Sequence, residues 1–169
     1  AEEQQAAERV MMDLAVKYNK AVVQEQITAK EKSLDKATGK AESAQASAAK
    51  LDKKSEKANS ELKKIKAKQG KVQGNNAKLS GEIAGLEKKF QLTNNPKDLA
   101  KLAKVRQKLT KGESELAKLL SSEAKAQGNV NKIESAKPDA AKTEAERTQT
   151  REEILKEVEQ LKRKLNDIR

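Results

Sequence analysis

The chain has 169 residues, of which 37% are charged, and a formal net charge of +11 at pH 7. Its two aromatic residues, Tyr18 and Phe90, are too few for a globular interior, which large rings usually dominate. The chain has no Cys and no His, which excludes disulfides, thiol nucleophiles and the usual zinc sites. This composition favours helices that bury narrow apolar stripes against each other, and the periodicity described below argues against a disordered chain.

Residues 1–26 carry a broader apolar surface than the rest of the chain. In the register of the helix that follows, Asp13 and Lys20 would occupy the apolar stripe, so the apolar face here has a different phase. We interpret the apolar residues of this segment as a contact with a second copy of the chain; the alternative is a frayed chain end. These residues are Val10, Met11, Met12, Leu14, Val16, Tyr18, Val22 and Val23.

A single seven-residue register runs from Ile27 to Phe90 without a slip, which predicts a long coiled-coil helix over residues 2–92. We call the two repeating apolar positions of this register the seam. Alanines fill the middle of the seam, and glycines at 70, 74, 81 and 85 weaken its end, where the alternative is a break at 74–76. The larger seam residues are Leu51, Leu62, Ile65, Leu79, Ile83 and Leu86.

The strongest signal for a helix end in the chain lies at residues 93–95, which we predict to form a turn. Asn95 is a good helix cap, and Pro96 suits the first position of a new helix. So short a connection joins antiparallel neighbours, so Asn94, Asn95 and Pro96 predict the bend of a hairpin. Residues 1–20 would then overhang the end of the second helix.

The second predicted helix covers residues 96–169 and has its own seven-residue register. Pro138 predicts a kink near 135–139 that preserves the register; alternatively, residues 139–169 fold back as a third helix. Its larger seam residues are Leu102, Leu109, Leu116, Leu119, Ile133, Ile154 and Leu161. The fold class is therefore all-α, a long antiparallel coiled-coil hairpin that forms a single elongated domain over residues 1–169.

The sequence offers no catalytic, cofactor-binding or metal-binding constellation, so we expect a non-enzyme without cofactors. Carboxylate catalysis needs paired acids in a shielded pocket, whereas the acids here alternate with lysines along narrow helices. Residues 30–72 carry thirteen lysines against six acids, but they lack the aromatic and arginine side chains that read nucleic-acid bases. We therefore expect no functional nucleic-acid binding, although an anionic surface would satisfy the same charges.

The hypothesis that these features favour is a self-associating structural protein, a subunit of a filament, sheath or surface fibre. Residues 1–29 carry a net charge of −2 and residues 30–72 one of +7, which favours staggered contact between copies. The alternatives are a coiled-coil tether or adaptor stalk and a non-specific electrostatic binder. No apolar run is long enough to span a membrane. We expect a secreted, periplasmic or cell-surface bacterial protein if Ala1 is a mature N-terminus, and a cytoplasmic fragment otherwise.

Overall fold

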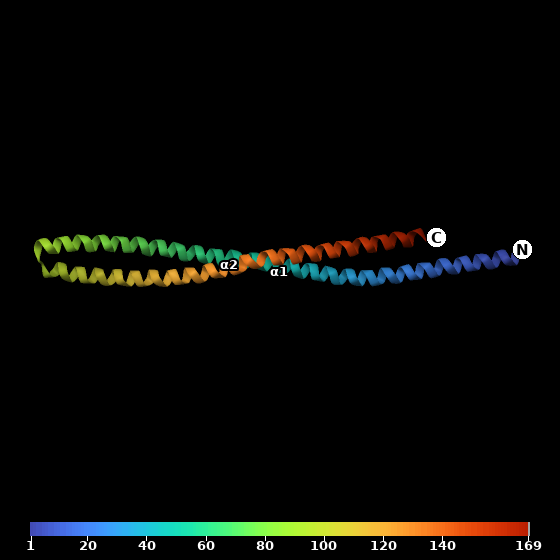
Figure 1. Cartoon of the computed structure of the whole chain (residues 1–169), viewed down its shortest axis with the longest axis horizontal. Helices are drawn as coiled ribbons and strands as arrows, with labels where there is room; N and C mark the ends of the chain where they lie inside the picture. The colour runs from blue at the N-terminus through green and yellow to red at the C-terminus, as the bar shows by residue number, and fades with distance from the viewer. Residues whose placement is uncertain (169) are drawn as a thin grey trace. The chain divides into compact units, whose positions relative to one another are not determined.

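The computed structural model describes residues 1–168, and these residues form two α-helices, α1 (Glu2–Thr93) and α2 (Pro96–Asp167). The helices are joined at one end and pack against each other, which confirms the predicted all-α helical hairpin (Figure 1). Ala, Leu, Lys, Glu and Gln dominate both helices, and all five residue types favour helix formation. α1 continues through residues 74–76, so the predicted alternative of a break there is wrong.

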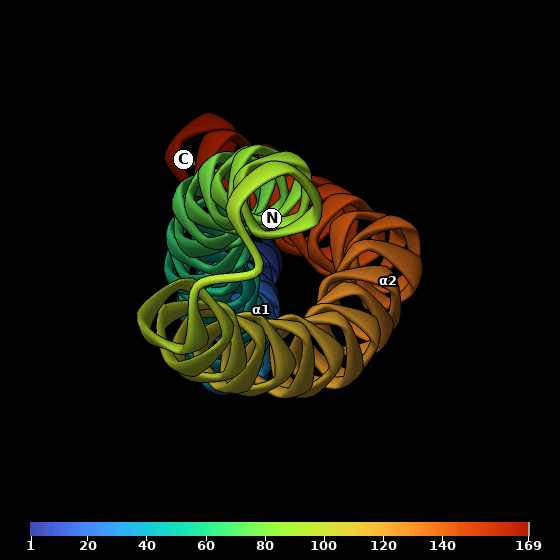
Figure 2. The ribbon, with the colours of Figure 1, turned by 90° about the vertical axis from the view of Figure 1, so that its left-hand side faces the viewer.

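Two residues, Asn94 and Asn95, connect the helices (Figure 2). Asn94 has a φ of 50°, a left-handed conformation that Asn tolerates better than most residues, and its N–H donates to the Phe90 carbonyl at 2.7 Å. Asn95 caps the second helix, because its Oδ1 accepts a hydrogen bond from the N–H of Lys97 at 3.0 Å. Each asparagine thus serves one helix end, which explains how so short a connection reverses the chain.

The first turn of α2 is fixed by a buried carboxylate. Pro96 is the first residue of this helix, where no backbone donor is needed. Asp98 is buried and accepts a hydrogen bond from the Thr93 hydroxyl at 3.1 Å, and Lys89 Nζ lies 3.8 Å from its other oxygen. Its negative charge also suits the positive end of the helix dipole. Thr93 is the last residue of α1, so the connection is one residue shorter than the predicted turn over 93–95.

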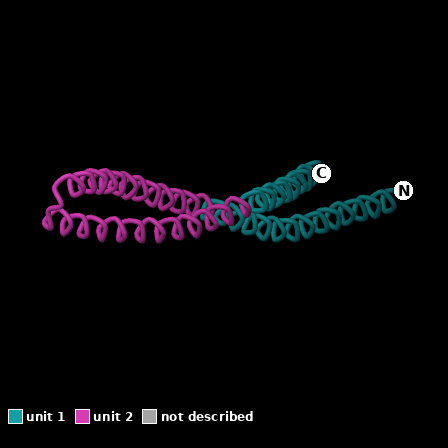
Figure 3. Tube along the Cα trace, turned by 60° about the vertical axis from the view of Figure 1, so that its left-hand side comes forward, with its two compact units in different colours: residues 1–50, 137–169 teal, residues 51–136 magenta. Residues whose placement is uncertain are grey.

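The chain divides into two compact units, and both helices contribute to each of them (Figure 3). Unit 1 comprises Ala1–Lys50 and Lys137–Arg169, and unit 2 comprises Leu51–Ala136. α2 continues through Pro138 to Asp167, so the predicted alternative of a third helix over 139–169 is wrong. Pro138 has no N–H to donate to the backbone carbonyl four residues earlier. The kink near 135–139 stays a prediction.

The core of unit 2 is the cluster of Ala58, Leu62 and Val130, against which Ala126 and Ile133 pack. Small and medium side chains suffice here because two helices enclose only a narrow strip between them. Leu102, another predicted seam residue, is also buried. The other predicted seam residues of this unit are half-buried: Leu51, Ile65, Leu79, Ile83, Leu86, Leu109, Leu116, Leu119 and Ile133.

In unit 1 the buried strip consists mainly of valines, alanines and one isoleucine. Val23 and Val158 are its most buried side chains, at 4% and 3% exposure. The predicted seam residues Ile154 and Leu161 are half-buried. Alanine side chains contribute little apolar area each, so this unit buries less per turn than a leucine seam would. The remaining buried apolar residues are Ile27, Ala37, Ala41 and Ala44.

The seam of unit 2 contains one glycine that its environment requires. A Cβ added to Gly112 would collide with the side-chain amide of Asn76, whereas nothing lies within 4 Å of a Cβ added to Gly85. The Oδ1 of Asn76 is buried and has no hydrogen-bond partner. Gly112 therefore makes room for the Asn76 amide, while Gly85 is an ordinary exposed helical glycine whose flexibility weakens the helix.

We expect Gly85→Ala to raise the free energy of unfolding by about 0.5–1 kcal/mol, because alanine is the better helix former. Gly112→Ala should raise the free energy of unfolding less than Gly85→Ala does, or should lower it, since the Asn76 amide must move. Thermal unfolding followed by circular dichroism measures both effects. Combining Gly112→Ala with Asn76→Ala should restore the gain relative to Asn76→Ala alone. Equal gains at Gly85 and Gly112 in the otherwise unchanged chain would contradict the collision.

Candidate functional site

The most distinctive surface of the described residues is an exposed apolar stripe on the first turns of α1. Its members recur at steps of three and four residues, the spacing that places side chains on one face of a helix. Met11, Leu14 and Tyr18 are 70%, 60% and 70% exposed, and Val10 beside them is also exposed. We call this surface the N-terminal stripe; it consists of Ala7, Val10, Met11, Leu14, Tyr18 and Ala21.

The N-terminal stripe lies on the side of α1 that faces away from α2. The α2-facing side is marked by Val16, Val23 and Ile27, which are half-buried or buried and share a second helical face. Leu14 and Val16 are two residues apart, which places them about 200° apart around the helix axis. α1 thus has two apolar faces in this segment, and the chain covers only the face of Val16, Val23 and Ile27, from Val16 onward.

The eight residues predicted as an oligomer contact do not form a single open surface. Val10, Met11, Leu14 and Tyr18 lie on the N-terminal stripe. Met12 is exposed but lies on the α2-facing side, four residues before Val16. Val16 and Val22 are half-buried, and Val23 is buried. Val23 therefore drops out of the predicted contact, because unit 1 already covers its side chain.

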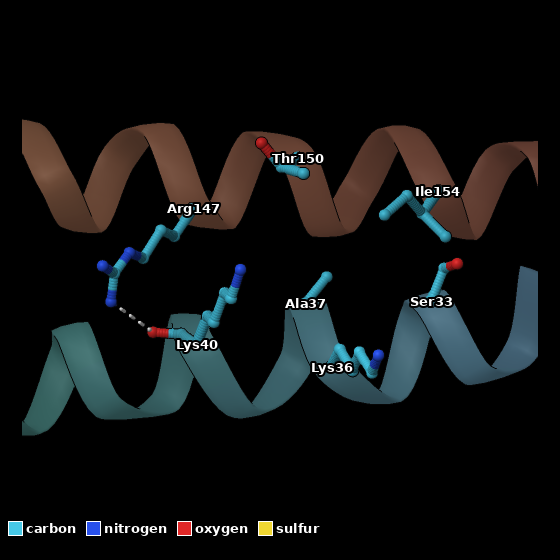
Figure 4. Close-up of a pocket in the computed structure, with 7 residues that line it drawn as sticks. All are labelled: Ser33, Lys36, Ala37, Lys40, Arg147, Thr150 and Ile154. Carbon is cyan, nitrogen blue, oxygen red and sulfur yellow. Dashed lines mark hydrogen bonds between the residues drawn. The ribbon is translucent and has the colours of Figure 1, made fainter.

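Unit 1 also contains a shallow groove of about 350 Å³, in which long basic side chains replace the apolar seam (Figure 4). Arg147 Nη1 donates to the Lys40 carbonyl at 3.5 Å, and nearby Arg151 Nε donates to the Thr38 hydroxyl at 3.1 Å. The lining offers cations and hydroxyls but no carboxylate that would act as a general base. Its residues are Ser33, Lys36, Ala37, Lys40, Arg147, Thr150 and Ile154.

Two of the polar pairs that bridge the helices within unit 2 involve buried residues of the seam, Ser55 and Gln69. Ser55 Oγ donates to Glu134 Oε1 at 2.6 Å. Gln69 Nε2 donates to Glu123 Oε2 at 2.7 Å and to the Leu119 carbonyl at 3.3 Å. Buried polar residues in a coiled-coil seam usually specify pairing at a cost in stability. These pairs connect α1 to α2, and their geometry provides no reactive group held against a substrate pocket.

Among residues 1–168, no group of three or more acidic side chains is arranged to hold a metal ion. No segment of α1 or α2 in this described range combines the length and the apolar character that a membrane span requires. Comparisons of the chain with protein-family models, with curated proteins and with solved structures found no match. The function is therefore inferred from the N-terminal stripe and from the charge distribution of the chain.

Proposed function

We propose that the protein is a structural, self-associating coiled-coil protein, the subunit of a filament, sheath or surface fibre. The observation that carries this proposal is the N-terminal stripe, whose large apolar side chains are exposed on the side of α1 away from α2. Contiguous exposed apolar patches of this kind mark interaction sites. Neither an electrostatic binder nor a simple stalk requires such a stripe, which is why self-association is the function that the geometry supports best.

A longer second helix would not cover the N-terminal stripe. Any helix that continued along the path of α2 would follow the α2-facing side of α1, which Val16 and Val23 define. On that side, the next positions toward the start of α1 are Met12 and Arg9, which are separate from the N-terminal stripe. The apolar side chains of the stripe point the other way, so they need a different partner.

The charge distribution supplies a second reason for contact between copies. Residues 1–29 have a net charge of −2, whereas residues 30–72 have one of +7. Opposite charges at different heights along the helices favour a staggered arrangement of neighbouring copies. A filament needs at least two different contacts on each subunit, because one symmetric contact closes into a dimer. The N-terminal stripe would provide one of these contacts, and the attraction between residues 1–29 of one copy and residues 30–72 of another would provide the second.

We expect the double substitution Met11→Glu/Leu14→Glu to abolish self-association. Burying each of these side chains in a contact contributes about 1.5–3 kcal/mol, so losing both from each copy should raise the dissociation constant more than about a thousandfold. Sedimentation velocity across a concentration series measures the change. The wild-type chain should sediment increasingly faster than an 18.6 kDa monomer, and the variant should stay monomeric.

The matched control is Gln5→Glu/Asn19→Glu, which adds the same charge to the same segment at exposed positions outside the stripe. This control should associate like the wild type and should have the same helix content by circular dichroism. A wild-type chain that stays monomeric at every concentration would overturn the proposal. Equal weakening by the control and by the stripe variant would show that net charge, not the stripe, governs association.

A further inference from the structure

We infer that two copies dock through their N-terminal stripes in antiparallel orientation, with Met11 of one copy against Leu14 of the other. This inference rests on the proposed function and specifies its first contact. The stripe has the alternating four- and three-residue spacing of a coiled-coil seam, at positions 7, 11, 14, 18 and 21. A second helix with the same spacing is therefore a geometrically suitable partner, and a second copy supplies one.

The stripe has a defined length, which limits the registers in which two copies can pair. Glu25 occupies the next position of the same face, seven residues after Tyr18, and Glu3 flanks the opposite end. A shift by one heptad would place one of these carboxylates against the apolar stripe of the partner. Burying an unpaired carboxylate costs far more than burying a neutral side chain, so pairing centred on Met11 and Leu14 is favoured.

Charge decides between the two orientations. In parallel pairing each Glu25 would face the same residue of the second copy, and Glu3 would lie across from Glu8. Both are like-charge contacts, which oppose association. In antiparallel pairing with Met11 against Leu14, the two Glu25 side chains lie far apart, and Glu3 lies near Gln24 of the second copy. Antiparallel pairing thus removes both repulsions.

Side-chain size favours the same orientation. Antiparallel pairing in this register places Tyr18 of each copy over Ala7 of the other, so a large side chain fills the space that a small one leaves. Parallel pairing would set two Tyr18 rings against each other and leave two Ala7 methyl groups facing across a gap. Apolar seams of uniform packing are more stable than seams with alternating crowding and voids.

Cysteine cross-linking tests the orientation directly, because the natural chain has no cysteine. Met11→Cys and Leu14→Cys chains are prepared separately, mixed under reducing conditions, equilibrated and then oxidised. Tryptic cleavage after Arg9 and Lys17 leaves either new cysteine in the same peptide, so mass spectrometry distinguishes mixed from symmetric disulfides. We expect the mixed disulfide to exceed either symmetric one at least about fivefold, since only antiparallel pairing brings the two positions within disulfide reach.

Gln149→Cys, at an exposed position of α2, is the control for random collision and should cross-link poorly. Symmetric disulfides in excess would show parallel pairing and overturn the inference. Chains that still associate in sedimentation but cross-link no better than the control would also overturn it, while leaving self-association intact. Chains that never associate would refute the proposed function as well. If such chains cosediment with anionic phospholipid vesicles and lose this binding when Met11 and Leu14 are substituted, the stripe would be assigned to a membrane surface.

Discussion

Replacing Leu62 by alanine is expected to lower the free energy of unfolding by about 2–4 kcal/mol, because it removes a buried side chain and leaves a cavity. Leu62 is 8% exposed and belongs to the apolar cluster of unit 2 with Ala58 and Val130. The alanine side chain is too short to fill the space, and two-helix packing offers no third element that would collapse into it. Urea denaturation followed by far-UV circular dichroism measures the loss.

Leu120 provides the matched control, because Leu120→Ala removes the same atoms from a helix of the same unit. The Leu120 side chain is 51% exposed, so its truncation should change the free energy of unfolding by no more than about 0.5 kcal/mol. Helix propensity changes equally in both variants and cancels in the comparison. Similar losses at Leu62 and Leu120 would show that the stability of unit 2 does not depend on this cluster.

The hairpin could be predicted from the sequence because its two strongest signals are local. The seven-residue register reports burial directly, since a residue facing the other helix must recur with that period. The polar residues Ser55 and Gln69 fall in the register and are indeed buried, although neither would be assigned to a core by type alone. The position of the connection could also be predicted, because Asn95 and Pro96 have intrinsic preferences for the positions that they occupy.

What could not be predicted depends on contacts between distant segments. The burial of Asp98 is one example, because it accompanies contacts with Thr93 and Lys89 across the connection. Arg147 and Arg151 hold seam positions yet remain exposed, because their long side chains reach past the seam to α1. A heptad pattern gives the position of such residues but not the direction in which a long side chain leaves it.

The N-terminal stripe shows the same limit for the candidate site. The sequence revealed an excess of apolar residues in residues 1–26 and a change of phase. The predicted overhang of residues 1–20 separated Leu14 from Val23 along the helix, but Val23 was still included in the predicted contact, because both residues belong to one apolar segment. The structure separates them by burial: Val23 is covered within unit 1, whereas Leu14 faces away from α2. Which side chains of an apolar segment are covered is a tertiary property that periodicity alone does not encode.

The second large effect is expected at the polar pair of unit 2: Gln69→Leu/Glu123→Leu should raise the free energy of unfolding by about 2 kcal/mol. Gln69 is buried and donates to Glu123 and to the Leu119 carbonyl. Such a pair must lose water to form, so replacing both partners by apolar side chains is often stabilising. In a coiled coil of two separate helices, this gain in stability would be accompanied by a less specific pairing register. Here the connection at Asn94 and Asn95 already fixes the register.

Each single variant should gain less than half of the double, because each leaves one partner of the hydrogen bond without the other. Chemical denaturation of all four chains gives a coupling free energy of about 0.5–3 kcal/mol if the two side chains act as a pair. The matched control is Gln149→Leu/Glu153→Leu, where the same amide–carboxylate bond is exposed on α2; removing it should change stability by less than about 0.5 kcal/mol. A double variant at 69 and 123 that is less stable than the wild type would mean that the polar pair stabilises unit 2 in its own right. The seam would then tolerate Ser55 and Gln69 because their hydrogen bonds to α2 contribute more than leucine packing between two helices, which would reverse the usual ranking of apolar over polar seam residues.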